Sequence, residues 1–434
     1  MVHHRTGFGS LLTCLATALA VVAGGAWATD KPGEQQIHLG VATCASSTCH
    51  GRVEAAEDSP VALNEYFIWS KYDSHANAFE VLKDEWSQRI ATNMGLENAA
   101  SAEACLACHT DYVPARQRGE RFHLSDGIGC ESCHGGAETW IDSHYGPDTS
   151  HADNLRQGMA PTEESLFQAR MCQSCHLGDD ERQITHEMMA AGHPRLRFEL
   201  DTWLANMPPH HVVDADYSRR KNDAGSVERW VASNLAASEE YLSRLADHIG
   251  SKSLSPELSL FDCHACHRPM DTAIRRSVGE RRLIPAGSLR PNDHALRMLG
   301  IIVELRDPDL AQVIRRGNRS LHAAAAQTAS DFRSRAMQLR ENVVRAAELF
   351  RGQPLSADDR HSLETTLLQR AADGWFRDYA DAEQLFLGLQ SLAAQVPTTT
   401  SRRYDALFRL LDDEQAFEPE KVAAEAGRLL RDSR

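Results

Sequence analysis

The 434-residue sequence is poor in aromatic residues, which make up 6% of the chain. A protein of this size normally builds its core with more aromatic bulk, so another apolar material must fill part of the interior. Positive charge is not in excess either, because the formal net charge is −15. This balance argues against nucleic acid and anionic lipid as partners, and it favours redox partners that present a basic face.

The chain also has almost no cysteine outside one repeated pattern. Ten of its eleven cysteines belong to five sites in which a His directly follows the second Cys. In order, the sites are Cys44, Cys49 and His50; Cys105, Cys108 and His109; Cys130, Cys133 and His134; Cys172, Cys175 and His176; and Cys263, Cys266 and His267. This is the attachment pattern of c-type haem, with thioethers from the two cysteines and a proximal ligand from the His. The sequence therefore predicts five covalent haems.

The first site has four residues between its cysteines instead of two, a longer loop that can present the same three groups. Zinc sites pair C-x-x-C units into four-ligand sets and do not require the following His each time. A thioredoxin-like motif occurs once, near a βαβ pattern, and we find no such pattern. Haem is therefore the favoured interpretation. It leaves no thiol of the mature chain for a disulfide.

The N-terminus has the features of a secretory signal over residues 1–28. Arg5 provides the positive charge, Leu11–Ala23 is apolar, and Ala26-Trp27-Ala28 fits a cleavage site. The apolar run is short for a membrane span, so we expect its removal and a periplasmic protein. An uncleaved N-terminal anchor is the alternative. Cys14 follows Thr13 early in this run, which disfavours a lipoprotein cysteine.

The pattern favours a mainly α-helical fold, in which helices and loops of a multihaem core pack around five haems. We place this pentahaem domain at residues 29–290 and a C-terminal helical domain at residues 291–434. Helical periodicity predicts Asn64–Asn93 and Val227–Ile249 in the first domain. In the second it predicts Asp293–Arg306, Ser320–Arg351, Ala357–Ala372, Asp381–Ala394, Ser401–Leu411 and Pro419–Arg431. Five macrocycles within residues 44–267 must lie close together, which suits electron transfer between them.

The sixth ligand of each iron determines whether it carries electrons or binds substrate. His75 lies beside the apolar stripe of its predicted helix, His193 precedes Pro194 at a helix entrance, and His294 opens the first helix after the fifth motif. His144 is too close to the third motif to cap that haem easily, but it could cap a neighbour. His186 and His123 are second choices. We expect His210 and His211 to be exposed and inert, and His264 to be a spacer.

The order of these features resembles the multihaem family represented by cytochrome c-554. The shared features are Trp69-Ser70 with Ser74-His75-Ala76, then Gly127-Ile128-Gly129 leading into the third motif, His144, and Ala191-Gly192-His193-Pro194. The resemblance covers about residues 41–209. It implies stacked haem pairs, with His144 capping the first haem, His75 the third and His193 the fourth. It leaves the second haem as the candidate for a five-coordinate iron.

This sequence departs from that family in its widened first motif, its fifth haem at residues 263–267 and its helical tail. The partner of the fifth iron is expected to be His294, which is our inference alone. We favour an electron carrier between periplasmic or membrane-bound respiratory partners. The alternatives are an oxidoreductase acting on a small nitrogen or sulfur compound, and a structural subunit of a respiratory complex. A C-x-x-C-K site, typical of pentahaem nitrite reductases, is absent from the sequence. The oligomeric state is not indicated.

Overall fold

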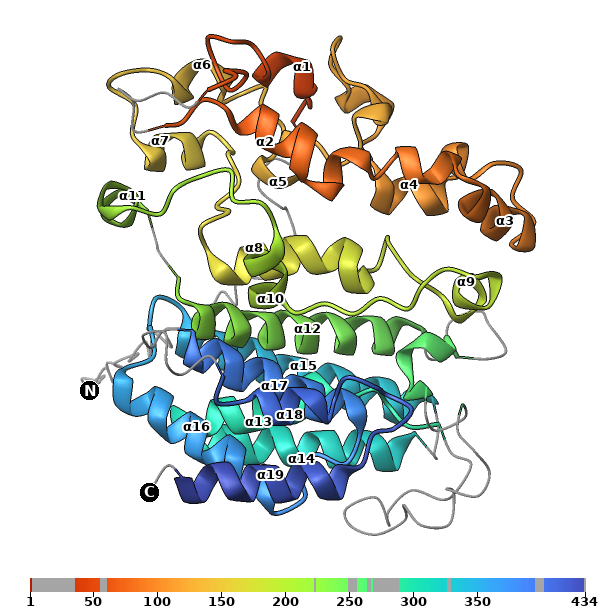
Figure 1. Cartoon of the computed structure of the whole chain (residues 1–434), viewed down its shortest axis with the longest axis vertical. Helices are drawn as coiled ribbons and strands as arrows, with labels where there is room; N and C mark the ends of the chain where they lie inside the picture. The colour runs from red at the N-terminus through yellow and green to blue at the C-terminus, as the bar shows by residue number, and fades with distance from the viewer. Residues whose placement is uncertain are drawn as a thin grey trace.

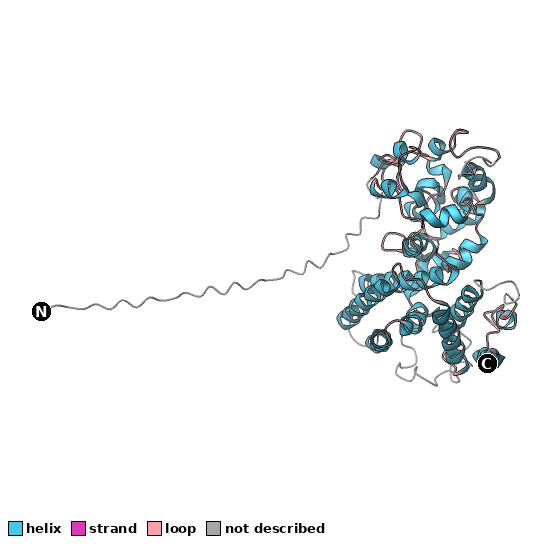
Figure 2. Ribbon diagram, turned by 90° about the vertical axis from the view of Figure 1, so that its left-hand side faces the viewer, coloured by secondary structure: helices cyan, strands magenta, loops and turns pink. Residues whose placement is uncertain are grey.

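The computed structural model describes residues 1, 36–54, 61–221, 224–248, 256–263, 267, 289–325, 329–394 and 402–432. These residues form helices and loops (Figure 2). Their only β-type pairings are the isolated bridges His38–Arg118 and Phe261–Pro291. The predicted mainly α-helical class is confirmed. Within these residues, no helix combines the length and apolar character needed to cross a bilayer. The predicted signal segment lies almost wholly outside the described residues.

Short helices and long loops make up the N-terminal half, which occupies the upper part of Figure 1. Its α-helices are α1 (Val41–Cys44), α2 (Glu65–Tyr72), α3 (Glu85–Asn93), α4 (Glu103–His109), α5 (Cys130–His134), α6 (Ile141–His144), α7 (His151–Arg156), α8 (Ser165–Gln173), α9 (His186–Ala191), α10 (Leu200–Asn206) and α11 (Ala215–Arg220). Its buried apolar residues form only small clusters, such as Leu82, Ala91, Ala99 and Leu106. We call residues 36–221 the haem half, after the four motifs that they contain.

Longer helices form a bundle in the lower part of Figure 1. They are α12 (Ser226–His248), α13 (His294–Ile302), α14 (Pro308–Ala324), α15 (Ala329–Phe350), α16 (Ala357–Ala372), α17 (Tyr379–Ala393), α18 (Asp405–Arg409) and α19 (Pro419–Asp432). Every fully buried member of the largest apolar cluster lies between Val227 and Leu430. Capping boxes and N-caps start several of these helices, for example Ser356 with Asp359 on α16 and Asp307 before Pro308 on α14.

Helix α12 joins the two halves. It packs against α8 and α10 on the haem side and against α13, α15 and α17 on the bundle side. Its Trp230 is completely buried in the bundle core, although it precedes the domain boundary expected at residue 291. The division at residue 291 stays a prediction, and α12 contributes to both cores.

The helix predicted over Asn64–Asn93 is wrong as a single element. The chain is interrupted between α2 and α3 by η1 (Ser74–Asn77) and η2 (Glu80–Lys83). Asp73 and Asp84 cause the breaks, because each adopts extended backbone and its carboxylate accepts a backbone N–H of the next turn. The prediction for α12 is confirmed within one residue, and that for α16 is exact. The predicted Ser320–Arg351 helix is wrong, since α14 ends at Ala324 and α15 begins at Ala329.

Candidate haem sites

The second, third and fourth motifs lie on short helices that bring the first Cys and the His of each motif to one face. The second motif ends α4, the third forms α5, and the fourth spans the end of α8 and η6 (Ser174–Gly178), a π-helix. Residues four apart on a helix share a face, so the first Cys and the His of each of these three motifs point the same way. In the fifth motif the His267 N–H donates to the Cys263 carbonyl at 2.7 Å, which is the same turn. His264, Ala265 and Cys266 lie outside the described residues.

The widened first motif closes by a longer turn. The His50 N–H donates to the carbonyl of Cys44 at 3.1 Å, and the Gly51 N–H donates to that of Ser46 at 2.9 Å. The four intervening residues are thereby folded out, and the ends of the motif meet as they do in the shorter motifs. This local geometry suits attachment of the same group.

Cysteines of different motifs lie side by side. The Cys44 thiol lies near Cys130, which brings the first and third motifs together. Cys108 lies near Cys175, which brings the second and fourth motifs together. Cys133 interacts electrostatically with Cys172, which joins the third and fourth. The order of the motifs in space is therefore first, third, fourth, second.

Four of the motif histidines face a second histidine. Ring-centre separations are 6.2 Å for His50–His144, 5.9 Å for His176–His75, 6.3 Å for His134–His210 and 6.2 Å for His267–His186. A metal–imidazole bond is about 2 Å long, so two rings on opposite sides of one ion have centres roughly 6 Å apart. The four pairs are thus spaced for one iron each.

The second motif differs from the other four. His109 interacts electrostatically with His193, but among the described residues this pair makes no ring contact like those above. Helix α9 and Gly192 place His193 near α3: the Asn93 side-chain amide donates to the Ala191 carbonyl at 2.9 Å. Gly192 has φ +120° and closes α9 against Ile90 and Trp86. His193 is therefore on the same side of the molecule as the second motif, with a looser arrangement.

Hydrogen bonds hold several of these rings by Nδ1 and leave Nε2 available. Nδ1 of His50 bonds Glu65 at 3.0 Å, and Nδ1 of His75 pairs with Asp73 at 3.0 Å. The Nδ1 atoms of His109, His144 and His193 bond the carbonyls of Ala78, Ile141 and Pro194 at 2.8, 2.6 and 2.8 Å respectively. A metal-binding His commonly donates its second ring N–H in this way, which fixes the tautomer and the ring orientation.

Other histidines have Nε2 engaged. Nε2 of His151 contacts Glu163 at 2.6 Å, that of His248 contacts Gln183 at 2.7 Å, and that of His322 contacts Asp293 at 2.8 Å. These bonds occupy the nitrogen that the paired histidines leave free. His151, His248 and His322 therefore have a structural role in this fold.

The histidine placements differ from several expectations. His144 lies beside His50, as the resemblance implied. His75, expected at the third motif, lies beside His176 of the fourth, because η1 turns it toward η6 instead of continuing a long helix. His193, expected at the fourth, lies toward His109.

The partners of the third and fifth motifs also differ from expectation. His210, expected to be exposed and inert, faces His134. His294, expected at the fifth motif, hydrogen-bonds Asn292 through Nδ1 at 2.9 Å at the start of α13, while His186 faces His267. Spacing along the chain gives no signal for His210, since loop 207–214 carries it to the third motif. His186 was a second choice on sequence grounds.

The surroundings of the paired rings fit an apolar cofactor. Trp203 is 47% exposed and Tyr145 is 71% exposed, yet their rings lie 4.9 Å from His176 and 5.6 Å from His144. Large apolar side chains that line such sites gain by covering a macrocycle. Burial lowers the pKa of His134 to about 3 and that of His176 to about 4, which keeps both imidazoles in the neutral form that ligates a metal.

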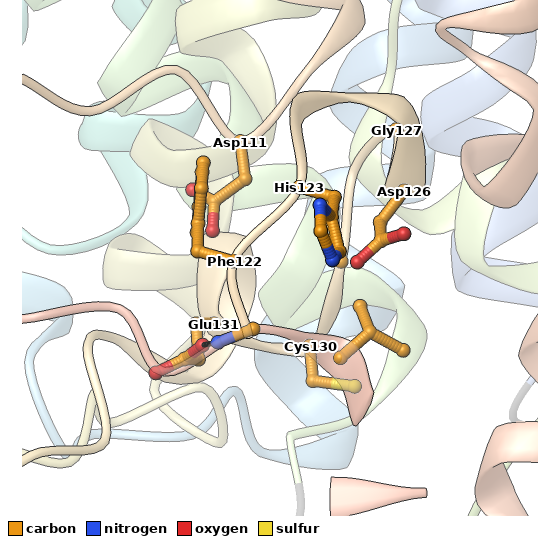
Figure 3. A pocket seen from close by; sticks show the side chains of 10 residues that line it. Asp111, Phe122, His123, Asp126, Gly127, Cys130 and Glu131 are labelled. Atoms are coloured by element: carbon orange, nitrogen blue, oxygen red, sulfur yellow. Dashed lines mark hydrogen bonds between the residues drawn. The ribbon is translucent and has the colours of Figure 1, made fainter. Parts of the chain in front are cut away.

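A pocket beside the third motif shows how the N-terminal segment is held (Figure 3). In it, His123 and Asp126 lie near Cys130, and Asp111, Phe122 and Glu131 occupy the other side. The Glu131 carboxylate accepts the N–H groups of Leu39, Gly40 and Ala137 at 2.7–2.8 Å. His38 and Asp111, 2.7 Å apart, are close enough to Glu131 to form a three-ligand group. The backbone bonds of Glu131 explain this cluster as a clamp between residues 37–40 and the third motif.

Comparison with known proteins supports c-type haem attachment in this part of the chain. Residues 43–135, which contain the first three motifs, match the family model for cytochrome c554 and c-prime. The chain is a c-type cytochrome resembling that family. Covalently bound c-type haem and electron transfer follow from the match. The matched span is shorter than the expected 41–209. Comparisons with curated proteins and with solved structures gave no match.

Proposed function

We propose that this cytochrome is a periplasmic pentahaem electron carrier. The observation that carries the proposal is the set of four His–His pairs, each spaced for one iron. An iron with two His ligands has no open position for substrate, so it transfers electrons. The five attachment sites are Cys44, Cys49 and His50; Cys105, Cys108 and His109; Cys130, Cys133 and His134; Cys172, Cys175 and His176; and Cys263, Cys266 and His267.

The proposed sixth ligands are His144 for the first haem, His193 for the second, His210 for the third, His75 for the fourth and His186 for the fifth. The contacts between motif cysteines support a route from the first haem through the third and fourth to the second. The fifth haem adjoins this route through His186, whose N–H donates to Glu257 at 2.8 Å near the fifth motif. Bound haems would pass electrons from edge to edge, and the protein's own residues hold the motifs in order.

The partners we propose are periplasmic or membrane-bound redox proteins with a basic docking face. Residues 36–225 contain 29 acidic and 15 basic residues, whereas residues 226–434 contain 30 and 29. Nearly all of the net negative charge is therefore in the part that carries four of the five motifs. Such a field speeds the approach of a cationic partner and weakens as salt is added. The signal-like N-terminus supports export, with an uncleaved anchor as the alternative.

A second candidate function is an oxidoreductase acting on a small nitrogen or sulfur compound at the second haem. The looser relation of His109 to His193 favours it, since a weakly held or absent sixth ligand leaves an iron open. Under this alternative, the other four haems would supply electrons to one reactive iron held by His109.

Electron paramagnetic resonance of the purified ferric protein tests the proposal. We expect low-spin signals from all five irons and no binding of carbon monoxide to the ferrous protein. A high-spin signal with carbon monoxide binding in the unaltered protein would instead support the oxidoreductase.

Two neighbouring variants test one proposed ligand directly. His210→Ala should convert one iron to high spin, because its ring is the one facing His134. His211→Ala is the matched control, since the His211 ring stacks on Tyr217 at 5.4 Å, and it should leave all five irons low-spin. Identical spectra for the two variants would contradict the assignment of His210.

A further inference from the structure

Arg182 lies where the second and fourth motifs meet. Its Nε donates to the carbonyl of Ala107, inside the second motif, at 3.0 Å. Its Nη1 donates to the Asp179 carboxylate at 2.8 Å, just after the π-helix that carries the fourth motif. One side chain therefore links two haem attachment sites that are far apart in the sequence.

The turn that carries Arg182 is closely held. The Asp179 carboxylate accepts the N–H groups of Glu181 and Arg182 at 3.0 and 2.8 Å, and the Asp179 N–H donates to the Arg182 carbonyl at 2.8 Å. The side chains of Arg182 and Asp179 are 20% and 15% exposed. A guanidinium fixed at both ends in a largely buried position keeps its orientation and is weakly screened by salt.

The positive charge of Arg182 interacts electrostatically with cysteines of both attachment sites. The guanidinium of Arg182 interacts electrostatically with Cys175 of the fourth motif. Arg182 also interacts electrostatically with Cys108. In the haem-loaded protein these sulfurs are neutral thioethers, so the guanidinium charge would act on the two macrocycles bound beside it.

We propose that Arg182 is a positioning residue for electron transfer between the second and fourth haems. Its positive charge also raises the reduction potentials of these two haems. This inference rests on the proposed function. Transfer moves one electron from a ferrous iron to a neighbouring ferric iron, with no bond made or broken and no proton required. Each reduction removes one positive charge from an iron centre, so a fixed cation nearby favours the reduced state. Asp179 opposes this effect, because its carboxylate favours the oxidised state.

Spectroelectrochemical titration of the purified haem-loaded protein tests the proposal. Arg182→Gln keeps a hydrogen-bond donor and removes the charge, and it should move two of the five couples to lower potential. We expect a change of several-fold in the ferric-to-ferrous ratio of those two haems at a fixed applied potential, where tenfold corresponds to 59 mV. Arg182→Lys keeps the charge and should retain most of the potential.

Two further variants make the result decisive. Asp179→Asn should move the reduction potentials of the same two couples upward. If Arg182→Gln loses a haem, this variant still tests whether charge at this site sets the two potentials. Arg156→Gln is the matched control, because Arg156 is exposed on α7 and pairs with Asp153. Titrations of Arg182→Gln and Asp179→Asn that match this control, with five haems present, would overturn the role of Arg182 and leave the proposed function standing. An unaltered protein that lacks a second or fourth haem would instead overturn the proposed function.

Discussion

The haem half and the helical bundle differ in what fills their interiors. In the bundle, Leu299, Ile302, Ile314 and many other large side chains are almost fully buried in one continuous apolar cluster. In the haem half, many of the buried apolar residues are alanines, and large side chains such as Tyr72, Trp86 and Trp203 stand exposed. A segment of this length cannot offset its chain entropy with so small an apolar core. The comparison teaches that the haem half is built to be completed by its cofactors, and that the bundle is not.

The largest effect should come from removing the third haem. Cys130 lies near Cys44 of the first motif and Cys133 interacts electrostatically with Cys172 of the fourth, so this haem would lie between those two. Cys130→Ser combined with Cys133→Ser should make the haem half sensitive to proteases while the bundle stays resistant. Limited proteolysis with mass spectrometry of the fragments would measure this. Equal resistance of both halves would contradict the claim that only the haem half depends on its cofactors.

Truncation of a core side chain should affect the bundle alone. Ile314 is fully buried on α14, so Ile314→Ala should lower the free energy of unfolding of the bundle by about 2–5 kcal/mol. Its neighbour Val313 is 38% exposed, and Val313→Ala should change stability by about 0.5 kcal/mol or less. Denaturant unfolding followed by circular dichroism and by haem absorbance would separate the halves. A haem signal that shifts together with the helical signal would argue against independent interiors.

A buried carboxylate should make the bundle sensitive to acid. Asp293 accepts hydrogen bonds from Asn318 at 2.6 Å and His322 at 2.8 Å. Burial alone would raise its pKa, but His322 and Arg297 outweigh burial and hold it below the ordinary value. The stabilisation is therefore fully present above the unfolded-state pKa of about 4, and it is lost as pH falls through the lower folded-state value.

Asp293→Asn should reduce stability at neutral pH by about 1–3 kcal/mol and flatten its dependence on pH below about 4. Thermal unfolding between pH 3 and pH 7 measures both effects. The exposed Asp309 on α14 offers a control, Asp309→Asn, that should keep the acid dependence of the unaltered protein. An unchanged pH profile in Asp293→Asn would exclude this carboxylate as the source.

The smallest expected effect concerns the ion pairs of Glu239 at the interface between the two halves. Glu239 on α12 pairs with Arg170 of α8 at 2.6 Å and with Arg340 of α15 at 2.9 Å. The arginines are partly exposed, so Glu239→Gln should cost about 1 kcal/mol or less. The same unfolding experiment, repeated at high salt, should show the unaltered protein approaching the variant. A loss of several kcal/mol would show that the halves depend on this interface.

The features that depend on neighbouring residues along the chain could be predicted from the sequence. Helical periodicity located α12 and α16, and the position of His after Cys predicts the haem sites without any knowledge of the fold. The break at Asp73 was missed, because a carboxylate that caps a new turn competes with an apolar stripe that continues across it. Spacing along the chain does not predict most of the ring contacts of the motif histidines, since His134 and His210, or His176 and His75, meet through tertiary packing.

The central claim is that four haems complete the haem half of this protein and that a fifth is bound at the motif Cys263–His267. Intact-mass spectrometry of the exported protein, together with a pyridine haemochrome assay, tests it most directly. The account predicts five covalently attached haems per chain, including one at the widened motif Cys44–His50. Four or fewer haems per chain would contradict it, and a peptide map showing Cys44 and Cys49 unmodified would place the failure at that motif.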